Sequence, residues 1–322
     1  MTTDWKSLAK ETVHSFDADE VRGMWDVDWQ RARTVFLADH EAEIAAEPRR
    51  WKRALRKTNA IVFGLAKRLA PPRRLVFALV LLLTVVMARE LQAQLIPRVL
   101  PEIGVFELGG FNRIANTVGG DLYAFESLSN GRLAVLFGDA SGHGMAAGLV
   151  MAVTHAVFRT QLPVDPAPGV MIEALNRVLC ETGNSRSFFA GVYALLEPGG
   201  VVTAYVAGHP PVLKVDAEGR VVKRLGSGSY PLGIKKNAAY APESTVLAPG
   251  EMLLFHSDGL PEARGASGEE FGDTRIEHFL FRKAGAAPYE VVSALAEELD
   301  RFLGRAVCDD DVSIAAVRLK TA

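Results

Sequence analysis

Residues 138–148, GDASGHGMAAG, place an acid, a histidine and four glycines directly after the apolar run RLAVLF. Such a run predicts a buried strand, so Asp139 would stand at a strand end. The turn either cradles a phosphate with its backbone or holds a metal through Asp139. The spacing G-x-G-x-x-x-G lacks the Gly-Lys-Ser/Thr of a nucleotide-binding loop, which makes the cradle the weaker interpretation. His143 is a candidate proton donor, with turn structure or a supporting hydrogen bond as the alternatives.

Further acids share this placement at the ends of predicted strands. Asp121 opens LYAFESL, Asp258 closes EMLLFHS, and Asp309, Asp310 and Asp311 precede VSIAAVRL. Carboxylates brought together at buried strand ends repel one another strongly unless cations neutralise them. Carboxylates without a matching histidine or cysteine cluster suit Mg²⁺ or Mn²⁺ rather than zinc. Taken singly, each acid also fits a turn or a cap, but together they favour a metal site that activates water against a phosphoryl group.

The elements that must position these acids begin near residue 98. From there, short apolar runs are separated by glycine-containing turns, and EPGG predicts a hairpin loop. Helical spacing appears in AAGLVMAVTHAVFRTQL, PGVMIEALNRVLCET and PYEVVSALAEELDRFLG. Strands that cluster with helices between them predict a largely antiparallel α+β fold, in which helices cover a sheet.

The N-terminal part of the chain has a different character. Residues 1–47 have the spacing of one or two amphipathic helices, and residues 49–74 contain ten Lys or Arg and no acid. A basic amphipathic stretch suits an anionic membrane surface, nucleic acid or an acidic partner. We expect residues 1–74 to form a helical, basic regulatory region, and we rank nucleic acid below a membrane surface as its contact.

Residues 75–88 are apolar except for Thr84, but these fourteen residues are short for a membrane-spanning helix, which needs about 20. They form either a membrane-embedded or interfacial segment, or a buried helix that continues through RELQAQLIP as a homodimer seam. The positive-inside rule would place the following chain outside the cytoplasm. Two cysteines without a disulfide framework, and an N-terminus without an apolar signal region, favour the cytoplasm instead. We expect a cytoplasmic protein that can associate with the inner face of the cytoplasmic membrane.

Seven sequence blocks in order resemble the SpoIIE-like branch of the PPM, or PP2C-like, metal-dependent protein serine/threonine phosphatases. They lie within about residues 90–320: GGDLYAF, GDASGHGMAAGLVMA, FFAGVYALLEP, AGHPPVL, YPLGI, GEMLLFHSDGLPEARGASGEEFG and CDDDVSIAAVRL. The resemblance implies an α-β-β-α sandwich of the PP2C type over residues 98–322, with residues 75–97 as a linker helix. It also implies hydrolysis of phosphoserine or phosphothreonine, often on a STAS-domain anti-anti-sigma factor in bacterial partner switching.

The same resemblance implies a site for two Mn²⁺ or Mg²⁺ ions between the sheets. Asp139 would bridge both ions, and a metal-bound hydroxide, rather than a side chain, would attack phosphorus. Asp139 and Asp258 would therefore be the catalytic acids, with His143 as a further candidate. The implied ligands are Asp121, Asp139, the backbone carbonyl of Ala140, Asp258, and Asp310 or, as the alternative, Asp311.

Three positions depart from the family pattern. Ala124 replaces an acid, Ala190 a frequent threonine, and Pro261 another frequent threonine. These changes keep open the alternative of a pseudophosphatase that sequesters a regulatory phosphoprotein without turnover. His209 in AGHPP is either catalytic or fixes the turn that follows it.

Overall fold

The computed structural model describes residues 80, 87, 92, 94–97, 99–115, 118–142, 144–183, 187–226, 228–304, 306 and 308–321. The chain divides into two compact units, Met1–Thr84 and Val85–Ala322, and nearly all described residues belong to the second. The predictions for residues 1–74, and that for His143, fall outside the described residues. Within residues 75–88, only Val80 and Met87 are described, and both are helical.

Two five-stranded antiparallel sheets form the centre of the second unit. The first sheet has the order β1 (Phe106–Arg113), β10 (Val312–Leu319), β9 (Met252–His256), β6 (Val212–Val215) and β7 (Val221–Leu225). The second has the order β2 (Leu122–Ser127), β3 (Leu133–Ala140), β4 (Phe189–Leu196), β5 (Val201–Ala207) and β8 (Glu243–Val246). The hairpin predicted at EPGG is the connection between β4 and β5.

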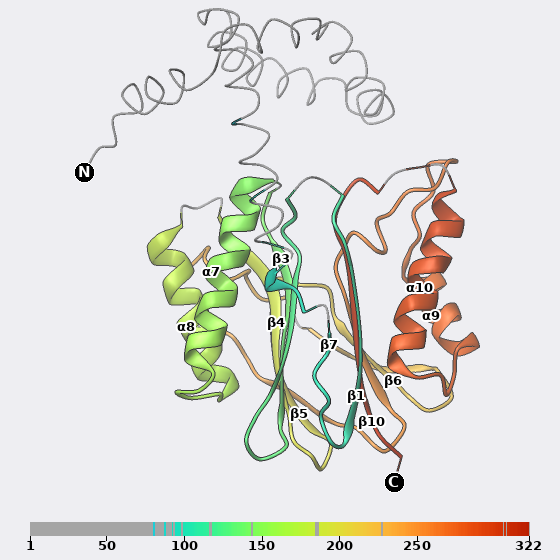
Figure 1. Cartoon of the computed structure of the whole chain (residues 1–322), viewed down its shortest axis with the longest axis horizontal. Helices are drawn as coiled ribbons and strands as arrows, with labels where there is room; N and C mark the ends of the chain where they lie inside the picture. The colour runs from blue at the N-terminus through green and yellow to red at the C-terminus, as the bar shows by residue number, and fades with distance from the viewer. Residues whose placement is uncertain are drawn as a thin grey trace, which may run out of the picture. The chain divides into compact units, whose positions relative to one another are not determined.

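Helices cover the outer face of each sheet (Figure 1). The helices α7 (Met145–Gln161) and α8 (Pro168–Thr182) contact the second sheet, and α10 (Pro288–Leu303) contacts the first, together with α9 (Asp273–Arg282). The predicted α-β-β-α sandwich is therefore confirmed. Sequence periodicity predicted three of these helices but not α9, which is short and buries only three apolar side chains, Ile276, Phe279 and Leu280.

Strand β3 shows how the layers place the acids. Leu133, Val135 and Phe137 belong to the cluster between the sheets, whereas the intervening side chains belong to the cluster under α7 and α8. Both faces are buried, so the strand is a continuous apolar run rather than an alternating one. Because side chains alternate along a strand, Asp139 lies on the same side as Phe137, facing the other sheet. Across the gap, the Phe137 ring lies 5.8 Å from the Phe255 ring.

In the parts of the chain that the structure describes, no helix combines the length and apolar character needed to cross a membrane.

Candidate metal centre

Four strand ends bring the predicted acids into one region. In the second sheet, the pairing of Leu122 with Gly138 places Asp121 and Asp139 on neighbouring strands. In the first sheet, the Ser257 amide donates to the Ser313 carbonyl at 3.0 Å, which brings the chain after β9 beside the chain before β10. Asp258 and the Asp309–Asp311 run therefore meet the acids of the other sheet.

Asp121 is almost completely buried, with 2% of its surface exposed. Burial, and then the carboxylate of Asp311, raise the pKa of Asp121 well above its usual range, although the hydroxyls of Ser313 and Ser257 act in the opposite direction. Its Oδ2 atom is buried and has no hydrogen-bond partner among the described residues. An orphaned carboxylate oxygen in this position is costly unless a proton or a cation binds it.

Asp139 lies in the centre of this cluster. Burial, followed by the charges of four other acids, raises its pKa to about 9; the acids are Asp121, Asp258, Asp310 and Asp311. Its Oδ1 atom and the Ala140 carbonyl oxygen approach the same glycine: a Cβ on Gly120 would overlap Asp139 Oδ1 and lie 2.6 Å from the Ala140 oxygen. Only glycine fits there, which explains the second glycine of GGD in steric terms.

Asp310 and Asp311 have different environments although they are adjacent in the chain. Asp311 Oδ1 accepts the amide N–H of Ala115 at 2.8 Å, and its Oδ2 accepts that of Gly120 at 2.7 Å. Asp311 therefore anchors the loop that leads to Asp121. Asp310 accepts one amide N–H, that of Asp311, at 2.8 Å, while burial raises its pKa. Asp310 is thus the acid of this pair with an oxygen to spare for a cation.

The acids fit divalent cations in their chemistry. Carboxylates and a backbone carbonyl are the hard oxygen ligands that Mg²⁺ and Mn²⁺ prefer. Burial, and after it the charges of neighbouring acids, raise the pKa values of Asp121, Asp139 and Asp310, and bound cations would stabilise these carboxylates in their charged form. Within the described residues, no three His, Cys, Asp or Glu side chains converge closely enough to form a metal-ligand set.

Gln92 is a residue of this centre that the sequence patterns did not single out. Its side chain pairs with the backbone of Gly119, donating from Nε2 to the carbonyl and accepting the amide N–H at 2.9 Å. It is 4% exposed, and Gly119 precedes Gly120, whose amide binds Asp311. A helix just after the apolar segment therefore holds the loop that carries Asp121.

We expect Gln92→Ala to destabilise the protein by about 2 kcal/mol, because the amide and carbonyl of Gly119 would lose their partners in a buried position. The Mn²⁺ concentration needed for half-maximal stabilisation should also rise, since the loop carries Asp121. Urea unfolding with and without Mn²⁺ measures both effects. Gln94→Ala, an exposed site on the same helix, is the matched control, and equal behaviour of the two variants would contradict this role.

His209 lies at the end of β5 beside the space between the sheets. Its ring meets the ring of Phe137 edge to face, with centroids 5.3 Å apart, and its Nδ1 lies 2.8 Å from the Pro210 carbonyl oxygen. Its Nε2 is buried without a hydrogen-bond partner among the described residues. The ring thus contacts the following turn, as the second of the two sequence interpretations expects.

Burial lowers the pKa of His209 to about 3, below its ordinary value of 6.5. As pH falls below 6.5, the unfolded chain gains a proton that the folded chain does not, so stability is lost at about 1.4 kcal/mol per pH unit. Between pH 7 and pH 5, the wild type should lose about 2 kcal/mol more than His209→Phe. Urea unfolding at both pH values measures the difference, and parallel losses in the two proteins would refute it.

Of the remaining sequence candidates, Ala190 is paired with Asp139 across β3 and β4, so the departure from threonine lies directly beside the central acid. Ala124 is buried in β2 under the helices. Pro261 lines a hollow next to Asp258.

Comparisons with known proteins agree with this architecture. The family model described as "Stage II sporulation protein E (SpoIIE)" matches residues 129–320. Protein IcfG of Synechocystis sp. is 25% identical over 258 residues, which cover 71% of this chain and 40% of IcfG. Phosphoserine phosphatase RsbP of Bacillus subtilis is 24% identical over 159 residues, which cover 48% of this chain and 39% of RsbP. The chain thus spans about two fifths of the length of each of these curated relatives.

Among solved structures, the SiaA-PP2C domain of Pseudomonas aeruginosa superposes with a TM-score of 0.65 at 18% identity, covering 73% of this chain and 95% of that domain. This likeness supports the PP2C-type fold that the sequence blocks predicted. The family match includes β3, β9 and β10, at whose ends Asp139, Asp258 and Asp310 lie. The resemblance drawn from the sequence is thereby confirmed: the chain belongs to the SpoIIE family.

Proposed function

We propose that this chain is a metal-dependent protein serine/threonine phosphatase, a phosphoric monoester hydrolase acting on phosphoserine or phosphothreonine. The observation that carries the proposal is the meeting of buried acids from both sheets, with an orphaned oxygen on Asp121 and a pKa of about 9 at Asp139. Membership of the SpoIIE family and a relative named phosphoserine phosphatase support it.

The proposed ligands for two Mn²⁺ or Mg²⁺ ions are Asp121, Asp139, the Ala140 carbonyl, Asp258 and Asp310. When bound, such ions supply activated water and offset the charge of the phosphoryl group. Asp139 would serve both ions because it interacts with the acids of both sheets. Asp311 would keep the loop before Asp121 in place through its two amide contacts, and Gly120 would leave room for Asp139 and Ala140. His143, which lies outside the described residues, stays a candidate proton donor.

The proposed physiological substrate is a phosphorylated STAS-domain protein in a partner-switching pathway. In this proposal, residues 1–74 are regulatory, residues 75–97 transmit their state through a homodimer or a membrane contact, and residues 98–322 are catalytic. The acidic balance of the catalytic part, with 26 Asp and Glu against 19 Lys and Arg after residue 98, makes nucleic acid an unsuitable partner for it. The location proposed is the cytoplasm, with the inner face of the membrane as a place of association.

Phosphate release from a phosphoserine protein tests the activity. We expect the full chain to release phosphate in the presence of Mn²⁺ or Mg²⁺, and we expect this release to stop when EDTA removes the metal ions. A second candidate function, binding of a phosphoprotein without turnover, is favoured by Ala190, which pairs with Asp139 where the family pattern frequently has threonine. Tight binding of a phosphorylated STAS protein, without phosphate release in any metal, would favour this second function.

A further inference from the structure

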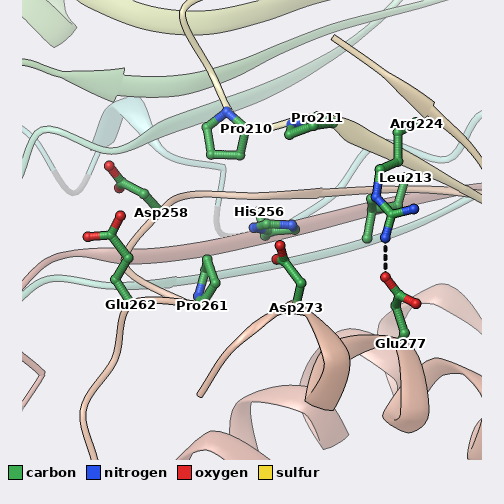
Figure 2. A pocket seen from close by; sticks show the side chains of 10 residues that line it. All are labelled: Pro210, Pro211, Leu213, Arg224, His256, Asp258, Pro261, Glu262, Asp273 and Glu277. Atoms are coloured by element: carbon green, nitrogen blue, oxygen red, sulfur yellow. Dashed lines mark hydrogen bonds and ion pairs between the residues drawn. The ribbon is translucent and has the colours of Figure 1, made fainter. Parts of the chain in front are cut away.

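A hollow of about 200 Å³ lies beside Asp258, between the first sheet and α9 (Figure 2). Strand β9 explains its position. Leu253 and Phe255 belong to the cluster between the sheets, whereas Met252 and Leu254 belong to the cluster under α9 and α10. By this alternation His256 faces the helix side. The hollow therefore adjoins the metal centre at Asp258 but opens from the other face of the sheet.

The lining of the hollow is strongly acidic. Figure 2 shows Asp258 and Glu262 at one end and the ion pair of Arg224 with Glu277 at the other, with Asp273 between them. Glu262 and Asp273 form no ion pair with any described residue. Their negative charge therefore favours a cation in the hollow.

His256 adds an observation that does not depend on the acids. Its side chain is 3% exposed and lines the hollow. Its Nδ1 lies 3.1 Å from the Ser257 carbonyl oxygen, which can only accept, so Nδ1 carries the proton. Nε2 is then an acceptor, and it has no hydrogen-bond partner within the described part of the chain. An unpaired acceptor in the wall of the hollow can accept a hydrogen bond from a ligand.

Shape and wall chemistry narrow the class of ligand. The volume of about 200 Å³ exceeds that of one water, about 30 Å³, several-fold, so the hollow suits a side chain better than a bare ion. Pro210, Pro211 and Leu213 provide an apolar wall, against which a methylene stem can pack while its charged head meets the acids. The guanidinium of Arg224 already pairs with one acid of the lining, Glu277.

We propose that this hollow binds an arginine side chain of the protein substrate, next to the phosphorylated residue. A guanidinium offers five N–H donors in one plane, which matches several separated acceptors, namely His256 Nε2 and the carboxylates of Glu262 and Asp273. The proposal rests on the proposed function, because the metal centre beside Asp258 is what would bring a phosphorylated segment to the hollow. It makes the hollow a determinant of substrate specificity.

Phosphoserine peptides test this with a matched pair of residues. In each peptide, one position near the phosphoserine carries either arginine or citrulline, which has a similar shape but no charge. With the full chain and Mn²⁺, arginine should raise kcat/KM about tenfold over citrulline at one position or two adjacent ones. Asp273→Asn should reduce that ratio to about two or less, and Asp273→Arg should reverse it in favour of citrulline. Glu297→Gln, which removes an exposed acid of α10 away from the hollow, should leave the ratio at its wild-type value.

A binding measurement separates failure of this proposal from failure of the proposed function. The same peptides, labelled with a fluorophore, are titrated with the full chain in EDTA, and the ratio of Kd values for citrulline and arginine is read from anisotropy. If no peptide is hydrolysed but arginine still binds tighter in a manner that depends on Asp273, the phosphatase proposal fails and the hollow is supported. Equal behaviour of arginine and citrulline by both readouts, or a ratio that Asp273→Asn leaves unchanged, overturns the proposal.

Discussion

Asp139→Asn should lower Mn²⁺-dependent phosphate release from a phosphoserine protein by about a thousandfold or more. Asp139 is the acid whose pKa responds to carboxylates from both sheets, so it is the residue on which the charge of two bound cations would converge. Losing a bridging carboxylate costs the several kcal/mol of charge stabilisation that metal ions provide to phosphoryl transfer, and about 4 kcal/mol corresponds to three orders of magnitude in rate. Asparagine keeps the size of the side chain, so the loop around Gly120 should fold as before.

The control for this variant comes from the same chain. Asp309→Asn also removes a carboxylate from the site's neighbourhood, but Asp309 is exposed and precedes the anchored residues. It should retain activity within about twofold. If Asp139→Asn were as active as Asp309→Asn, the bridging role would be excluded. If the wild type itself released no phosphate while binding the phosphoprotein, the second candidate function would stand.

The positions of the acids at strand ends were predictable because they depend on local sequence patterns. An apolar run predicts a buried strand, and the alternation of side chains along that strand predicts which side of the sheet Asp139 faces. Several acids at buried strand ends then predict a site for hard cations. The order of the sequence blocks then predicted the sandwich through a family resemblance. Helix α9 was not predicted because it is only ten residues long and largely polar, so its apolar pattern repeats over fewer than three turns.

Other features of the site depend on contacts between distant segments, and no local pattern encodes these. Asp310 and Asp311 differ in burial and in the amides that they contact. The amides that bind Asp311, those of Ala115 and Gly120, lie almost 200 residues away in the chain. Gln92 stands in an ordinary helical run, and only its pairing with Gly119 identifies it. The hollow beside Asp258 is lined by residues of β9, α9 and the turn after β5, among others. In the sequence EMLLFHSDG, His256 looks only like the end of a strand, because nothing local shows that α9 packs near it.

In metal-free protein, Asp139 should reduce stability increasingly as pH rises. Its folded pKa is about 9 and its ordinary value is 3.8. Between these values the folded state keeps a proton that the unfolded chain has released, so the free energy of unfolding falls by about 1.4 kcal/mol per pH unit. From pH 5 to pH 8, the wild type should lose up to about 4 kcal/mol relative to Asp139→Asn, as measured by urea unfolding in EDTA. Comparison with the variant cancels the opposing titration of His209.

Saturating Mn²⁺ should make the wild type more stable than Asp139→Asn at pH 8. Cations would take the place of the proton on Asp139 and the other acids, so the wild type at pH 8 should gain stability with the logarithm of the Mn²⁺ concentration, while Asp139→Asn gains much less. The same carboxylate would then destabilise the empty centre and stabilise the filled one. A wild type that is more stable than the variant at pH 8 in EDTA would contradict the crowded environment of Asp139. Equal stabilisation of both proteins by Mn²⁺ would place the ions elsewhere.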